Sequence, residues 1–133
     1  MRSGDHPPPP RPAAIDLAAA VLVFGGLLGF SQLALGEYVV TGSLPAKGPI
    51  IGVATIAYAA SIALGVVVRV GRAWLLAVNL AVLVAILYLP AADRPLPLVL
   101  ALLHGLAGAV LVAQRRWFAD VAAWRNGARD LSG

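Results

Sequence analysis

The chain has 133 residues, of which 60% are hydrophobic and only 12% are charged, and its mean hydropathy is +0.87. Because soluble domains carry about a quarter charged residues, this composition excludes an ordinary soluble protein and predicts an integral membrane protein. The net charge of +4 does not indicate nucleic-acid binding, because the arginines lie at the ends of apolar blocks, where anionic lipid headgroups attract them.

The chain begins with "MRSGDHPPPPRP", which has little to bury and a proline run that favours extended structure, so residues 1–12 are predicted to be a disordered cytoplasmic tail. Four apolar blocks follow, each near the roughly 20 residues that a membrane-spanning helix needs. They predict a transmembrane domain over 13–113, with helices at 13–35, 49–68, 73–89 and 97–113. The short connections "VGRA" and "PAADRP" make consecutive helices antiparallel neighbours, which predicts an all-α, up-down four-helix bundle.

The basic residues predict the orientation in the membrane. Eight of the ten lie on one side of the predicted bundle, before the first helix, in the turn between the second and third, or after the fourth. Only Lys47 and Arg94 lie on the other side. Because positive charge is retained in the cytoplasm, both termini are expected there, in a multi-pass protein.

The last segment, 114–133, changes pattern. Trp117, Val121, Trp124 and Ala128 recur at helical spacing, with charged residues largely off that stripe. This predicts a short amphipathic cytoplasmic helix whose tryptophan stripe faces lipid headgroups or the bundle. Anchoring to the membrane surface is favoured over a protein partner, which would require the same pattern.

Small residues four apart predict where the helices pack, because helices in lipid associate through close approach of their backbones. Gly25 and Gly29 form such a row in the first helix, and Ala57, Ser61 and Gly65 form another in the second. We expect these rows to line contacts within the bundle. A homo-oligomer formed through the glycine face of the first helix is the alternative.

Five polar side chains within the apolar blocks form the candidate site, namely Thr55, Tyr58, Ser61, Asn79 and His104. Counting 1.5 Å per residue places His104 at the depth of Thr55 and Tyr58, and Asn79 near the depth of Ser61. His104 is therefore expected to face the interior and to pair with Tyr58 or Thr55. Structural hydrogen bonds are the favoured role, and a ligand or proton site at His104 is the alternative.

Nothing in the chain predicts catalysis. It has no cysteine, phosphate-binding loop, nucleophile elbow or paired carboxylates, and a single intramembrane histidine offers no metal or haem site, so we expect no enzyme and no cofactor. Asp16 lies in the first turn of the first helix, where a carboxylate is favoured by the helix dipole. The expected function is that of a structural, accessory or partner-binding subunit. A minimal oligomeric transporter or channel is the alternative.

Two stretches, "RPAAIDLAAAVLVFGGLLGF" and "GRAWLLAVNLAVL", resemble a loose group of uncharacterised small four-helix bacterial membrane proteins. In that group an Arg-Pro precedes a glycine-rich first helix, and a Gly-Arg-x-Trp turn begins a later one. The resemblance implies a bacterial inner-membrane location and no activity. The expected partners are the lipid bilayer and either a second copy of the chain or another membrane protein, with no nucleic acid.

Overall fold

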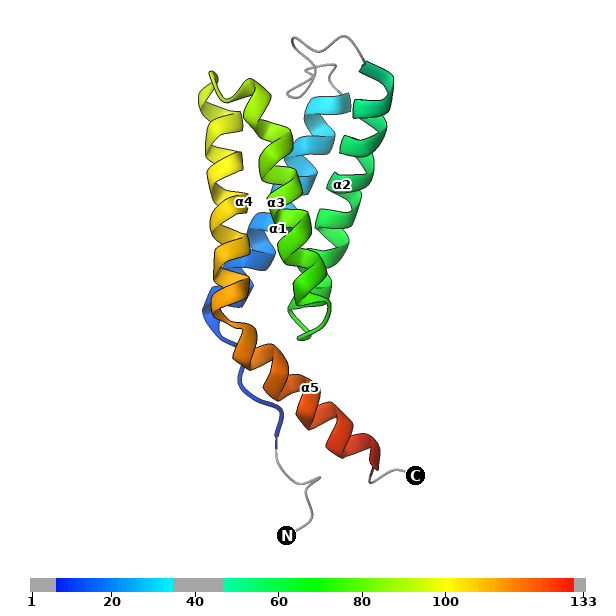
Figure 1. Cartoon of the computed structure of the whole chain (residues 1–133), viewed down its shortest axis with the longest axis vertical. Coiled ribbons are helices and arrows are strands. Elements are labelled where there is room, and N and C mark those ends of the chain that lie inside the picture. The colour runs from blue at the N-terminus through cyan, green and yellow to red at the C-terminus, as the bar shows by residue number, and fades with distance from the viewer. Residues whose placement is uncertain (1–6, 35–46, 131–133) are drawn as a thin grey trace.

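The computed structural model describes residues 7–34 and 47–130, and within them the chain is all-α, as predicted (Figure 1). In chain order the elements are α1 (Ala13–Ala34), α2 (Lys47–Val68), α3 (Trp74–Tyr88), the short 3-10 helix η2 (Leu89–Ala91), α4 (Pro95–Ala113) and α5 (Arg115–Asp130). The connection predicted around 36–48 falls mostly outside the described residues, as does the tail before residue 7.

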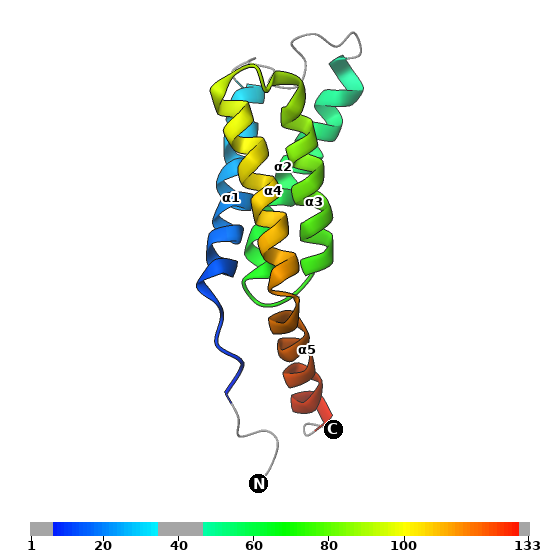
Figure 2. The same ribbon diagram turned by 60° about the vertical axis from the view of Figure 1, so that its left-hand side comes forward.

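Helices α1 to α4 lie side by side and alternate in direction (Figures 1 and 2). The principal contacts join α1 to α2, α2 to α3, α3 to α4 and α4 back to α1, so each helix has two main neighbours. Helix α5 leaves the lower end of this bundle obliquely, beside the N-terminal segment.

Among the helices in the described part of the chain, three are long and apolar enough to cross a membrane, over Ala13–Leu33, Pro49–Val68 and Pro95–Ala113. Helix α3 is apolar but has only 15 residues, a length of about 22 Å at 1.5 Å per residue. Large apolar side chains cover the outside of the bundle, among them Leu17, Ile56 and Leu102, each more than 60% exposed. Such an exterior suits lipid, because apolar side chains turned outward there meet hydrocarbon rather than water.

The turn between α2 and α3 depends on two residues with positive φ. Gly71 has φ +70° and Ala73 has φ 52°, and Ala73 immediately precedes α3. A side chain at Gly71 would be strained by its backbone and would also meet Val121 of α5. This glycine therefore allows α5 to approach the turn closely.

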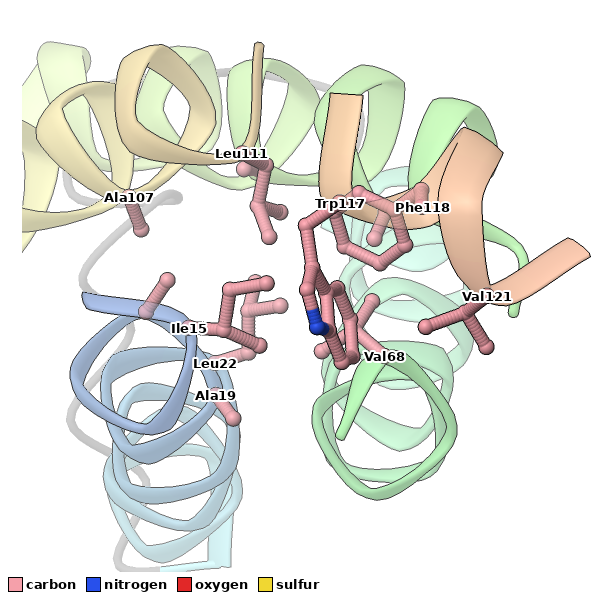
Figure 3. Packing of buried hydrophobic residues seen from close by; sticks show 12 residues of the cluster. Ile15, Ala19, Leu22, Val68, Ala107, Leu111, Trp117, Phe118 and Val121 are labelled. Carbon is pink, nitrogen blue, oxygen red and sulfur yellow. The ribbon is translucent and has the colours of Figure 1, made fainter. Parts of the chain in front are cut away.

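The lower part of the core extends from the bundle into α5. Trp117 lies between Ile15 and Leu22 of α1 on one side and Val68 of α2 on the other (Figure 3). Val121 belongs to the same buried cluster, whereas Trp124 is 36% exposed. The tryptophan stripe of α5 is predicted to face either lipid headgroups or the bundle. Trp117 and Val121 pack on the bundle rather than on the membrane surface.

Hydrogen bonds also hold α5 at this position. The guanidinium of Arg125 donates to the carbonyl oxygens of Val70 and Gly71, the latter at 2.8 Å. These carbonyls follow the end of α2 and lie outside a helical hydrogen-bond ladder, so a charged donor there satisfies acceptors that would otherwise need water. Helix α5 is therefore attached by a polar clamp beside an apolar contact.

Candidate functional site

Four helices each contribute one ring to a cluster inside the bundle. The rings belong to Phe30 of α1, Tyr58 of α2, Tyr88 of α3 and His104 of α4. Consecutive ring centroids are 6.2, 5.8 and 5.8 Å apart, which is the usual range for interacting aromatic pairs. We call these four residues the ring cluster. Tyr58, Tyr88 and His104 are at most 1% exposed.

The two glycines of α1 predicted to pack helices make room for this cluster. A Cβ atom at Gly25 would lie 2.5 Å from Nε2 of His104, and one at Gly29 would lie 2.6 Å from the ring of Tyr58. Both positions therefore contact side chains of other helices rather than a bare backbone. The prediction that Gly25 and Gly29 lie at a contact between helices is confirmed. The ring of His104 packs on Gly25, and the ring of Tyr58 packs on Gly29.

His104 faces the interior as predicted and is fully buried, but its predicted pairing with Tyr58 or Thr55 is wrong. Its Nδ1 lies 2.8 Å from the carbonyl oxygen of Leu100, one turn earlier in α4. A carbonyl only accepts, so Nδ1 carries the hydrogen in this bond and the neutral ring keeps its lone pair on Nε2. That Nε2 has no hydrogen-bond partner.

Tyr88 is a member of the cluster that the sequence analysis did not select. Its hydroxyl donates to the carbonyl oxygen of Gly25, at 3.2 Å, which links α3 to α1. The residue lies at the end of α3, and a tyrosine at a helix end is typical of an anchor at the membrane interface. The available signal was the spacing of Ala77, Ala81, Val84 and Tyr88, which places all four on one face, and this face is the buried one.

Ser61 makes the interhelical hydrogen bond that the small-residue row of α2 allows. Its hydroxyl donates to the carbonyl oxygen of Leu22 at 2.7 Å, and both residues are fully buried. Gly65, one turn further along, would place a Cβ 2.9 Å from the carbonyl oxygen of Ala19. Ala57, one turn before Ser61, is 2% exposed. Ser61 and Gly65 therefore lie against α1, where the two backbones approach closely.

The remaining two predicted polar residues do not face the interior of the bundle. Thr55 and Asn79 are exposed on the outside of the bundle. Each bonds a carbonyl one turn earlier in its own helix, Thr55 to Ile51 at 2.7 Å and Asn79 to Leu75 at 2.8 Å. The expected pairing of polar side chains by depth is therefore wrong for both, because each rotates outward and is satisfied within its own helix.

Asp16 forms an ionic group near the other end of the bundle. Its carboxylate forms salt bridges with Arg11, in the segment before α1, and with Arg69, just after α2. The Nε–Oδ1 distances are 3.0 and 2.9 Å. Arg11 also donates to the carbonyl oxygen of Arg69 at 3.1 Å. The carboxylate thus ties the start of α1 to the end of α2, and its side chain is 40% exposed.

Comparison with protein-family models, with curated proteins and with solved structures finds no match for this chain. The resemblance to small bacterial membrane proteins therefore stays a prediction. Within the described residues, no group of three His, Asp or Glu side chains is placed to hold a metal ion. In the same part of the chain, three buried polar atoms have no hydrogen-bond partner, namely Oε1 of Gln32, Nε2 of His104 and Nε1 of Trp117. Of these, the acceptor Nε2 of His104 lies in the ring cluster.

Proposed function

We propose that this chain is a four-helix integral membrane protein of the bacterial cytoplasmic membrane that acts as a structural or partner-binding subunit and not as an enzyme. Helix α3 is included as a fourth span because it is apolar and packs between α2 and α4. The basic residues Arg69, Arg72, Arg115 and Arg116 lie toward one end, which supports a cytoplasmic location for that end.

The observation that carries the proposal is the filled interior. The ring cluster contains a side chain from each of the four helices and is packed ring against ring. The cavities found in the described part lie between neighbouring elements, such as the apolar one of about 410 Å³ between α1 and α4. A single copy thus has a packed centre and an apolar exterior, which suits association with lipid or other helices.

The proposal is tested by reconstitution and by crosslinking. Liposomes containing the purified chain are expected to hold proton and potassium gradients as long as protein-free liposomes do. For crosslinking in cells, a photoreactive residue is placed at one exposed position on each helix in turn, namely Phe24, Ile56, Leu83 or Leu102. An adduct of defined size is expected from one of these positions and not from the others. Rapid loss of a gradient, with no adduct at any position, would overturn the proposal.

An oligomeric transporter is the second candidate, and one observation favours it. Nε2 of His104 is buried and without a partner, and ionisable groups within a membrane are commonly functional. His104→Phe keeps a ring at this place and removes the lone pair. If gradient loss is seen with the natural chain and disappears in this folded variant, the transporter replaces the subunit as the function.

A further inference from the structure

A basic cavity of about 610 Å³ lies between the turn that joins α2 to α3 and the first half of α5. Four of its ten lining residues are arginines, namely Arg72, Arg115, Arg116 and Arg125, and none of the ten is acidic. Like charges gathered around one space repel each other. An anion in that space would remove the repulsion, so the cavity has the electrostatic character of an anion site.

Three of these arginines are available to a ligand. Arg72, Arg115 and Arg116 are exposed and form no hydrogen bond or ion pair with any residue in the described ranges. The other basic side chains nearby behave differently, because Arg69 is paired with Asp16 and Arg125 bonds the turn carbonyls. We call the space bounded by the three available arginines the arginine cavity.

The wall of the arginine cavity is aromatic. The rings of Trp74 and Phe118 stack with centroids 5.9 Å apart and planes 23° apart, and both residues line the space. Trp74 is the first residue of α3, where a tryptophan marks the boundary between headgroups and hydrocarbon. The next two residues, Leu75 and Leu76, are 60% and 61% exposed. An apolar surface therefore leads away from the cavity along α3.

We propose that the arginine cavity binds the phosphate group of an anionic phospholipid. The guanidinium groups of Arg72, Arg115 and Arg116 supply paired N–H donors that match phosphate oxygens. An acyl chain would then lie over the exposed leucines at the start of α3. Basic pockets beside membrane helices bind anionic headgroups in this way. A soluble phosphate would use the same arginines but would gain nothing from the exposed leucines, and this difference favours the lipid.

The test measures lipid binding to the full chain in mild detergent by native mass spectrometry. Phosphatidylglycerol is expected to bind more tightly than phosphatidylcholine, and the preference should fall as salt is raised. Each arginine removed is expected to weaken phosphatidylglycerol binding about five-fold, so Arg72→Gln with Arg116→Gln should lower it about 25-fold. Arg94→Gln is the control for each single variant, because it removes one positive charge as Arg72→Gln or Arg116→Gln does, but at the start of α4, beyond η2.

The outcomes separate the lipid from other ligands. Equal binding of the two lipids by the natural chain, or an equal loss in the Arg94→Gln control, would overturn the proposal. Inorganic phosphate at the same concentration as the lipid is expected to displace none of it, and displacement would reassign the cavity to a soluble phosphate. If the double variant does not fold, the salt dependence and lipid preference of the natural chain still decide, since a preference that salt leaves unchanged contradicts an arginine site.

Discussion

The imidazole of His104 occupies the space that the absent side chain of Gly25 leaves on α1, so closely that a Cβ atom there would lie 2.5 Å from Nε2. The carbonyl oxygen of the same glycine accepts the hydroxyl of Tyr88. Gly25 of α1 thus contacts the side chain of Tyr88 from α3 and that of His104 from α4. This contact joins three helices at a single point and makes Gly25 a sensitive position for packing.

Gly25→Ala is expected to destabilise the fold by about 1–3 kcal/mol, the usual cost of overpacking a core. The midpoint of thermal unfolding in detergent measures it. Gly105→Ala on α4 is the control, because a Cβ at Gly105 meets nothing within 4 Å, and it should leave the midpoint unchanged or raised. In a His104→Ala background Gly25→Ala should cost less, and an undiminished cost there would contradict the contact.

Ser61→Ala should lower stability by roughly 0.6 kcal/mol, the mean value for hydrogen bonds between membrane helices. The variant removes the bond from α2 to the Leu22 carbonyl. Thr55→Val is the matched control, because it also removes a hydroxyl from α2, one that bonds only its own helix and faces outward. The same unfolding assay compares the two variants. Equal losses would show that the interhelical bond adds nothing.

Arg125→Gln is expected to loosen α5 without unfolding the bundle, because it removes a charged donor from the carbonyls of Val70 and Gly71. Hydrogen exchange should become faster in the amides of α5 and stay unchanged in α1 to α4, since locally weakened elements open on their own. The control, measured like the variant in lipid-free detergent, is Arg116→Gln. It removes an arginine of the same helix that makes no such bond, and it should leave exchange in α5 at the natural rate. Faster exchange in both variants would indicate a general effect of charge.

The predicted orientation can be checked with single cysteines, because the chain has none. Asp93→Cys, in the connection between α3 and α4, should react with an impermeant thiol reagent in intact cells. Asn126→Cys, on α5, should react only after the cells are opened. The reason is the retention of arginine-rich ends in the cytoplasm. Labelling of position 126 but not 93 in intact cells would reverse the assignment.

Much of the secondary structure follows from the order of residues alone. The helices lie within two residues of the predicted ranges at nearly every end, since runs of apolar residues and the prolines and glycines between them are local features. The burial of Ser61 and His104 also follows from the sequence, because a polar group in an apolar run is most stable inside a bundle. Depth along each helix is likewise predictable, since the rise per residue is constant.

The tertiary structure alone decided which polar groups meet. Thr55 and Tyr58 are three residues apart on α2, yet the first faces outward and the second enters the ring cluster. The rotation of a helix about its axis depends on how the rings of Tyr58 and His104 seat on Gly29 and Gly25, a contact between residues distant in the chain. A side chain that can bond a carbonyl of its own helix, as Thr55 does, needs no partner elsewhere. Equal depth therefore does not bring polar residues together, and only packing between helices selects those that touch.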